Sequence, residues 1–554
     1  MRGAAERSLS QARLGRASLV SVPGRASPVS ATVALLIALV VAAVFAPALG
    51  NGFVNWDDDV NITDNPHFRG FAAANLRWMF TTPRMGHYVP LTWLTLALDH
   101  ALWGMNPRGY HATSVLLHAA NAALVFLVAR RLLAGLPLAG PAFAALAFGL
   151  HPLRAESVAW VTERRDVLSG CFVLLAFLAY LRAAERVGRA RTGWRAASLL
   201  AYAASLLSKA ITMSFPLVLL IVDVYPLRRR ALREKVPYVA LAGLGAVLAI
   251  AALRTAAVTS WEAYGGTARF AMTVFSLAFY VSRTLVPVGL SPLYELPARI
   301  DPLAPAFALS LGLVAALTAA AVALRRRAPW LGAAWAAYVV MVLPVSGPVH
   351  AGLQIAHDRY SYLSCLPWAL LAGAGVGLLV AARRRRAISA PVVAGAATAA
   401  LALLVGWSYL TVQQVRIWRD SEFLWSAAVA AQPACSVCRG NLGRAYLAAG
   451  RIDAAANELQ VGLALRPDRA TLHNTLGAVR YRQQRYAESA AEFGLAARLR
   501  PGFAEPLNNL GVLEARVGDL DAAERHFASA LKLQPDYVEA RANLIRLMRQ
   551  APPR

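Results

Sequence analysis

Long blocks of apolar residues, separated by short basic segments, constrain this chain more than any other feature. The blocks are roughly 15–22 residues long, the length that an α-helix needs to cross the hydrocarbon of a bilayer. Apolar residues make up 58% of the 554 positions and charged residues 16%, against about a half and a quarter in ordinary soluble domains. We predict about eleven membrane spans, at 31–49, 111–130, 138–152, 166–182, 196–208, 211–226, 237–254, 304–324, 330–346, 362–382 and 389–410.

The net charge of +26 comes largely from arginine clusters between these blocks. Clusters of this kind mark the cytoplasmic loops of membrane proteins, so the charge is a topology signal and no nucleic-acid partner is expected. The clusters follow the even-numbered blocks, which places those ends inside and, with an odd number of spans, the chain beyond 410 outside. They lie at 130–131, 182–195, 228–230, 325–327 and 383–386.

The first thirty residues and two further blocks need separate interpretation. Residues 1–30 are basic and polar, and we read the next block as an uncleaved first span because 51–58 offers no clean cleavage site. Residues 270–288 contain Arg283, and residues 90–103 contain Asp99 and His100. We expect both of these blocks to be re-entrant or interfacial helices.

A 34-residue period runs through the C-terminal part of the chain. The residues in register are Leu442, Leu476 and Leu510, each followed by Gly, then Leu459, Phe493 and Phe527, and finally Pro433, Pro467, Pro501 and Pro535. This period and pattern are typical of tetratricopeptide repeats, helix pairs that stack into a solenoid with a concave groove. We predict a linker helix at 411–431, then three repeats and a terminal helix within 432–554.

Cys435 and Cys438 form a C-x-x-C pair at the head of the repeats. No His follows the pair directly and no second pair exists, so neither haem attachment nor zinc is indicated. A local disulfide on an oxidising side and two ordinary helix-start residues both stay open. Cys171 and Cys365 lie in apolar blocks, where cysteine is a packing residue.

An acidic loop follows the first predicted span. Within 51–110 it contains three adjacent carboxylates, Asp57, Asp58 and Asp59, and their mutual repulsion raises at least one pKa. Just beyond a span exit, such a cluster suits a general base at the membrane surface, whereas the alternative is a solvated acidic loop. The Asp57-x-Asp59 spacing leaves a divalent metal open, although transfer from a lipid phosphate does not require one.

Charged and polar residues at the mouths of other spans complement this loop. Such groups are costly near a membrane and usually functional, and arginine and lysine are phosphate ligands. For each residue alone the alternative is an interfacial anchor. We expect donor phosphate binding by Arg164, Lys209, Arg359 and Arg154, with His151, Glu156, His357 and Tyr360 as further site candidates and Arg165 as the weaker neighbour of Arg164.

Several motifs give the chain a resemblance to a known family. The most specific stretch is HPLRAESVAWVTERRDVLS from His151, and FVNWDD from Phe53, PLTW from Pro90 and DRY from Asp358 follow the expected order. They look like the membrane half of bacterial relatives of the transmembrane and tetratricopeptide repeat-containing proteins. The resemblance implies an all-α fold, with a C-type glycosyltransferase-like bundle of spans at 31–410.

The resemblance also implies an activity, that of an inverting, protein O-mannosyltransferase-like enzyme. The donor would be a sugar on a polyprenyl phosphate, with mannose as the family's sugar, and the acceptor a Ser or Thr hydroxyl of an exported protein presented by the repeats. Asp57 or Asp58 would be the base, with Asp58 preferred, and no bound cofactor or metal is expected. One departure is Val89, where animal members often have Arg, and this puts substrate contacts there in doubt.

Two other classes compete with the enzyme. A non-catalytic membrane scaffold would use the repeats to recruit envelope proteins, but eleven spans with charged external loops exceed what an anchor needs. A transporter would need ionisable residues near mid-membrane, for which Lys209 and Asp223 are the candidates. The expected location is a bacterial inner membrane, with the repeats on the periplasmic side.

Overall fold

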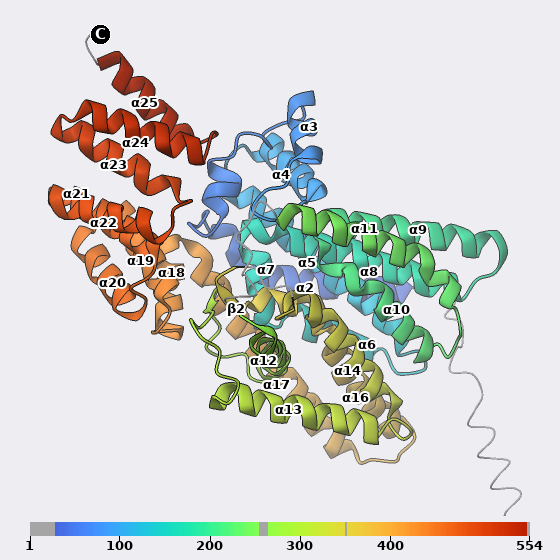
Figure 1. The fold of residues 1–554 in the computed structure, drawn as a ribbon. Helices are drawn as coiled ribbons and strands as arrows, with labels where there is room; N and C mark the ends of the chain where they lie inside the picture. The colour runs from blue at the N-terminus through green and yellow to red at the C-terminus, as the bar shows by residue number, and fades with distance from the viewer. Residues whose placement is uncertain (1–27, 254–263, 349–351, 551–554) are drawn as a thin grey trace, which may run out of the picture. The chain divides into compact units, whose positions relative to one another are not determined.

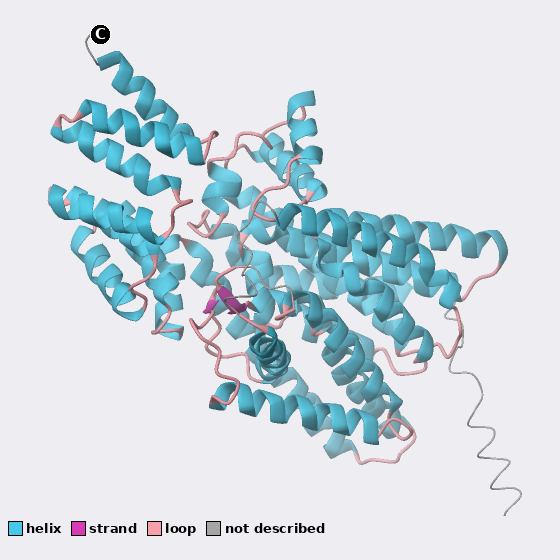
Figure 2. Ribbon diagram, in the orientation of Figure 1, coloured by secondary structure: helices cyan, strands magenta, loops and turns pink. Residues whose placement is uncertain are grey.

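The computed structural model describes residues 28–253, 264–348 and 352–550, and this part of the chain is almost entirely helical (Figures 1 and 2). It divides into two compact units. The membrane unit contains most residues up to Arg419, and the repeat unit contains Asp420–Arg554 with two short segments, Val54–Trp56 and Ser291–Glu295. The predicted basic N-terminus lies, up to residue 27, outside the described residues.

The helices of the membrane unit follow the predicted apolar blocks. Two short strands, β1 (Tyr294–Glu295) and β2 (Gln354–Ala356), interrupt the helical chain. The longer helices are α2 (Pro28–Phe45), α3 (Ala73–Thr81), α4 (Pro90–Trp103), α5 (Pro107–Leu132), α6 (Ala139–Gly149), α8 (Arg164–Ala184), α9 (Gly188–Ser208), α10 (Phe215–Val224), α11 (Val236–Leu253), α12 (Gly266–Leu285), α13 (Pro305–Ala323), α14 (Pro329–Val342), α16 (Leu366–Arg384) and α17 (Ala390–Arg416), with the short α7 (Ala155–Ala159) and α15 (Ser361–Ser364).

Seven helices of the described chain are long and apolar enough to cross a membrane, and three shorter apolar helices accompany them. Together they coincide with ten of the eleven predicted blocks, and the chain is a multi-pass membrane protein. The seven are Pro28–Gly50, Pro107–Leu132, Val161–Ala184, Leu232–Leu253, Pro305–Ala323, Leu366–Arg384 and Ala390–Arg419, and the three are Ala139–Gly149, Ala210–Val224 and Pro329–Val345.

The eleventh predicted block, 196–208, is the second half of α9. Three arginines in the first eight residues of this helix reduce its hydropathy, but α9 still lies antiparallel beside α8. Arg182, near the end of α8, stacks on Trp194 at 4.7 Å from the ring centre. Lys209, which follows α9, pairs with Asp166 in the first turn of α8 at 2.7 Å. The two helices therefore accompany one another over their full length.

Two predicted elements differ from simple spans. Helices α4 and α12 form where interfacial or re-entrant helices are expected, and neither is among the candidates for crossing, so their depth stays a prediction. Residues 411–431 are not one linker helix. They are divided between the end of α17 and α18 (Ser421–Ala431), because the Asp420 carboxylate accepts from the Phe423 N–H at 2.9 Å and so begins a new helix.

The repeat unit is a tetratricopeptide solenoid with three helix pairs and a terminal helix, as predicted. Its period has a packing origin: a Cβ on Gly477 would lie 2.6 Å from the Phe493 ring, so the glycine and the aromatic residue recur together. Cys435 and Cys438 form a disulfide at the start of the first pair. The helices are α19 (Ser436–Ala448), α20 (Ile452–Leu465), α21 (Ala470–Arg482), α22 (Tyr486–Leu499), α23 (Ala504–Val517), α24 (Leu520–Leu533) and α25 (Val538–Gln550).

Candidate active site

The three aspartates of the acidic loop have different environments. The Asp58 side chain is 1% exposed, and its Oδ1 accepts from the Thr162 N–H at 3.0 Å and the Thr162 hydroxyl at 2.7 Å. Asp57 is half-buried, with a left-handed φ of 64°. Asp59 accepts from the Val60 N–H at 2.9 Å and begins a single turn of π-helix, η2 (Asp59–Thr63). Asp58 is thus committed to a buried contact with Thr162, which is distant in the sequence.

Burial and neighbouring charges act on Asp57 in opposite directions. Burial raises the pKa of Asp57 to about 6, while the positive charges of Arg165 and Arg359 act to lower it. The nearby carboxylates of Asp59 and Glu163 add to the rise. A carboxylate with this pKa is mostly ionised at neutral pH, yet binds a proton more strongly than an exposed aspartate does.

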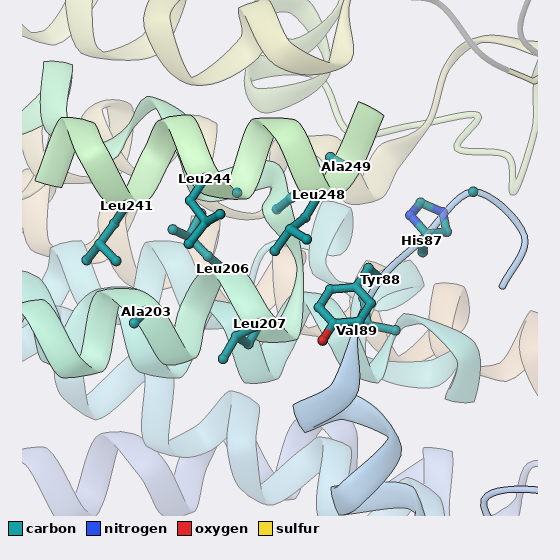
Figure 3. Close-up of a pocket in the computed structure, with 13 residues that line it drawn as sticks. His87, Tyr88, Val89, Ala203, Leu206, Leu207, Leu241, Leu244, Leu248 and Ala249 are labelled. Atoms are coloured by element: carbon teal, nitrogen blue, oxygen red, sulfur yellow. The ribbon is translucent and has the colours of Figure 1, made fainter. Parts of the chain in front are cut away.

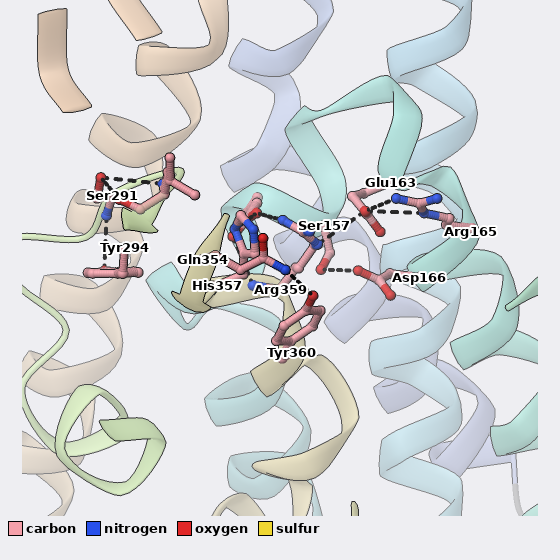
Figure 4. A network of polar contacts seen from close by, with 12 residues as sticks. Ser157, Glu163, Arg165, Asp166, Ser291, Tyr294, Gln354, His357, Arg359 and Tyr360 are labelled. Atoms are coloured by element: carbon pink, nitrogen blue, oxygen red, sulfur yellow. Dashed lines mark hydrogen bonds and ion pairs between the residues drawn. The ribbon is translucent and has the colours of Figure 1, made fainter. Parts of the chain in front are cut away.

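Three cations gather around the buried carboxylate of Glu163, and Figure 4 shows two of them, Arg165 and Arg359. Arg165 Nη2 lies 2.5 Å and Arg359 Nε 3.1 Å from Glu163 Oε1. Lys209 Nζ bridges Glu163 Oε2 and Asp166 Oδ1, at 2.7 Å from each. The three side chains come from α8, from the end of α9 and from the turn before α15, so segments distant in the sequence build one charged cluster.

Glu156 extends this cluster to the DRY segment. Its Oε1 lies 2.5 Å from Arg359 Nη1 and 3.3 Å from His357 Nδ1. Burial by itself would raise the pKa of Glu156, but Arg359 and His357 hold it below its ordinary value. Burial lowers the pKa of His357 to about 4, so this imidazole is neutral at pH 7. The Arg359 guanidinium lies over the Tyr360 ring, with its carbon 5.0 Å from the ring centre.

The other predicted residues lie in separate buried contacts. Arg164 is 0% exposed, pairs with Asp99 at 2.7 Å and donates to the Ser114 hydroxyl at 2.9 Å. Arg154 donates to the Ser361 hydroxyl at 3.0 Å. His151 bonds to the Thr284 carbonyl at 3.0 Å, and burial lowers the pKa of this histidine to about 3. These environments favour structural roles for the three side chains.

Glu163 and Arg165 are more central to the cluster than the sequence indicates. Glu163 stands at its centre, and Arg165 contributes the guanidinium expected from Arg164. Consecutive residues of a helix point about 100° apart, so only the packing of α8 decides which arginine faces the site. His87 was not predicted. Burial and the positive charges of Arg165 and Lys209 lower its pKa well below the ordinary value, so this histidine lies within electrostatic reach of the same cations.

An apolar groove of about 130 Å³ ends at His87 (Figure 3). It runs between α9 and α11, and most of its lining is aliphatic. His87 and Tyr88 are the polar residues of the lining, which comprises Gly86, His87, Tyr88, Val89, Ala203, Leu206, Leu207, Ala210, Leu241, Leu244, Gly245, Leu248 and Ala249.

Comparison with known sequences finds similarity to protein O-mannosyl-transferases. The chain is 35% identical over 156 residues to the human protein O-mannosyl-transferase TMTC2, a match of 27% of this chain and 18% of that protein. It is 41% identical over 97 residues to Drosophila melanogaster Tmtc1, which covers 18% of this chain and 11% of that protein. The predicted resemblance is confirmed over these segments, and the chain spans under a quarter of the length of such relatives.

Comparisons of the repeats and of the fold add three findings. The family described as TPR repeat matches residues 443–484. ArnT from Cupriavidus metallidurans, solved with undecaprenyl phosphate, has a TM-score of 0.36 at 16% identity and covers 86% of this chain and 80% of its own. The first TPR domain of human RPAP3 has a TM-score of 0.21 at 20% identity and covers 21% of this chain and 92% of its own.

Proposed function

We propose that this chain is a membrane glycosyltransferase that moves a sugar from a polyprenyl phosphate to a Ser or Thr hydroxyl of an exported protein. The observation that carries the proposal is the half-buried Asp57 beside the cations around Glu163. The curated relatives are named protein O-mannosyl-transferases, which makes mannose the first sugar to test. We further propose that the protein lies in a bacterial inner membrane with its repeats on the periplasmic side.

Asp57 is the proposed general base. It takes the proton of the acceptor hydroxyl as that oxygen attacks the anomeric carbon, and the bond from this carbon to the lipid phosphate breaks with inversion. Its pKa of about 6 suits this role because an effective base has a pKa near the working pH. We prefer Asp57 to Asp58, since the Asp58 carboxylate is buried and already accepts two hydrogen bonds from Thr162.

Arg165, Lys209 and Arg359 are the proposed phosphate ligands. Each retains 7–8% exposure, whereas Arg164 has none, so these three cations have an edge that a ligand reaches. Their charges are matched by the three carboxylates of Glu156, Glu163 and Asp166. A donor phosphate would exchange part of these contacts for its own, and the cations would stabilise the charge that develops as the phosphate leaves.

The groove between α9 and α11 is the proposed site for the first isoprene units of the donor. Its aliphatic lining suits a hydrocarbon chain, and His87 at its end lies near the proposed phosphate ligands. A neutral His87 would donate a hydrogen bond to the phosphate without adding charge. The absence of a metal requirement stays a prediction.

The decisive experiment uses purified protein, a mannosyl polyprenyl phosphate and envelope extract as acceptor. The wild type should transfer the sugar, and Asp57→Asn should reduce kcat on the order of a hundredfold or more, the scale of a lost base. Asp59→Asn is the matched control and should be close to wild type. A scaffold would bind partners through the repeats without any transfer, so the proposal fails if the folded wild type does not turn over such donors.

A further inference from the structure

The segment directly before the proposed base belongs to the repeat unit. Residues Val54–Trp56 cluster with Asp420–Arg554, whereas the chain from Asp57 onward belongs to the membrane unit. Val54 is 3% exposed, and the Trp56 ring meets the Trp425 ring edge to face at 5.1 Å. Three residues of the acidic loop are therefore part of the packed structure of the repeats.

Asn55 is held by hydrogen bonds along both its backbone and its side chain. Its N–H donates to the Ser421 hydroxyl at 2.8 Å, and its Oδ1 accepts from Trp425 Nε1 at 2.6 Å. Its carbonyl accepts from Arg444 Nη2 at 3.2 Å, and its Nδ2 approaches the Asn441 carbonyl at 3.5 Å. The partners lie on α18 and α19, so the first helices of the repeat unit fix both the position and the orientation of this residue.

Asp57 lies between two such anchors. Asn55 is fixed two residues before it, and Asp58 is fixed directly after it by the backbone and hydroxyl of Thr162. Asp57 itself has a φ of 64°, a left-handed conformation that is uncommon outside glycine. Such a conformation persists only when the surroundings impose it, and Asn55, two residues earlier, is held within the repeat unit.

We propose that Asn55 is a positioning residue for Asp57, and that α18 and α19 hold the acidic loop in its reactive conformation. The inference rests on the proposed role of Asp57 as the base. It gives the repeat unit a second task beyond presenting an acceptor, because the first helices contribute to the rate for every acceptor. Asn55 touches neither substrate, and its effect is transmitted through the two peptide bonds that separate it from Asp57.

The test compares full-length Asn55→Ala and Trp425→Phe with Asn474→Ala. Trp425→Phe removes the indole donor and keeps an aromatic ring. Asn474 is a buried asparagine that bonds within the repeats, to Glu505 at 2.9 Å and to Asn509 at 3.0 Å, and it serves as the matched control. Hydrogen exchange of the amides at 57–64 is measured together with kcat, the donor KM and the pH profile of kcat/KM.

Both loop variants should exchange faster at 57–64 and lose on the order of tenfold to a hundredfold in kcat, the scale of a small misplacement of a reacting group. The donor KM should stay within about twofold, because the phosphate ligands are elsewhere. Water entering the loosened loop should move the acidic limb of the pH profile to lower pH. Asn474→Ala should match the wild type in all four measurements.

Two outcomes would overturn the proposal. Unchanged exchange at 57–64 in Asn55→Ala and Trp425→Phe would show that the repeats do not hold the loop. Faster exchange with an unchanged kcat would show that the loop is held but that its order does not matter for transfer. A wild type that turns over no donor, with faster exchange in both variants, refutes the glycosyltransferase function while leaving the anchoring of the loop supported.

Discussion

The carboxylate of Asp57 carries an electrostatic cost that asparagine would relieve. Its pKa rises from an ordinary 3.8 to about 6, so the folded state binds the proton more tightly than the unfolded state. The ionised group therefore destabilises the fold, increasingly from pH 4 to 6 and constantly above. Asparagine tolerates the left-handed φ of this position as aspartate does, so the substitution removes the charge without adding backbone strain. Asp57→Asn should raise the free energy of unfolding at pH 7 by on the order of 1 kcal/mol.

Thermal unfolding of both proteins at pH 7 and pH 4.5 checks this prediction. The gain should be largest at pH 7 and should shrink at the lower pH, where Asp57 is protonated and uncharged. A variant that is less stable than the wild type at pH 7 would mean that the carboxylate has a stabilising partner. A gain in stability combined with a loss of turnover would be typical of a functional residue.

The same pKa predicts the pH dependence of the reaction. A general base must be deprotonated, so kcat/KM should fall about tenfold per pH unit below pH 6 and level off above it. The acidic limb should vanish in Asp57→Asn, whose residual rate has no such group. A limb that persists unchanged in this variant would assign it to another residue.

Arg164 and Arg165 allow a matched comparison of neighbours. Arg164→Gln leaves Asp99 buried and unpaired, which costs about 3–5 kcal/mol, so this variant should express poorly or unfold early. Arg165→Gln keeps the fold better because Lys209 and Arg359 still compensate Glu163. It should raise the donor KM or lower kcat roughly tenfold. Measuring the donor kinetics and the thermal unfolding of both variants distinguishes the two roles. The reverse pattern would identify Arg164, and not Arg165, as the phosphate ligand.

The sequence motifs identified most of the charged residues of the candidate site, but not the direction in which each side chain faces. The HPLRAES and DRY motifs supplied Glu156, His357 and Arg359, which the structure brings together. Whether Arg164 or Arg165 faces the cluster depends on the rotation of α8 against its neighbours. His87 escaped prediction because a lone histidine in a loop has no periodic pattern, and only the folded chain places it beside Arg165 and Lys209.

Helices were predictable from the sequence where packing or the membrane imposes a strong constraint on it. The repeats were predicted to the helix because the glycine of the first helix packs against a large side chain of the second helix in every unit, as Gly477 does against Phe493, and this contact fixes the period. Ten of the eleven predicted blocks coincide with apolar helices, and seven of these helices are long enough to cross a membrane, because crossing a bilayer requires a minimum length of apolar residues. Residues 411–431 were read as one helix because the break there depends on the local hydrogen bond of Asp420.

The groove between α9 and α11 predicts how substitutions on α9 change the KM for long-chain donors. Ala203 of α9 lines this groove, so Ala203→Phe should fill it and raise the KM for a long-chain donor at least tenfold. A donor with only two isoprene units should be affected less, because it reaches less far along the helices. Leu200→Phe is the control, since Leu200 is on the same helix, is 73% exposed and does not line the groove. Equal effects of both variants, or none, would remove the groove from the donor site.

For the molecule as a whole, the three chain segments that make up the repeat unit restrict the membrane topology. Val54–Trp56, Ser291–Glu295 and the repeats pack as one unit, so they lie on the same side of the membrane. The chain must then cross an even number of times between 56 and 291, and again between 295 and 420. Of the apolar helices described, five lie in the first interval and four in the second. The first interval therefore needs one more crossing.

Helix α9 is the expected sixth crossing of this interval, because it accompanies α8 from end to end. The alternative is α12, and the two choices place the intervening loops on opposite sides. If α9 crosses, residue 232 is cytoplasmic and residue 265 is external, in agreement with the arginines at 228–230. If α12 crosses instead, residue 232 is external and residue 265 is cytoplasmic. Leu232 is 73% exposed, and a side chain at Gly265 meets no atom within 4 Å, so both sites accept a cysteine.

A membrane-impermeant maleimide added to intact spheroplasts should label Gly265→Cys and leave Leu232→Cys unlabelled until the membrane is opened. A reporter that is active only outside the cytoplasm should be active when fused after Arg554, on the side where the Cys435–Cys438 disulfide forms. The reverse labelling would make α12 the crossing helix and leave the repeats in place. An inactive reporter would put the repeats, and with them the acidic loop, in the cytoplasm. Asp57 would then face no exported acceptor, and the proposed reaction would lose its substrate.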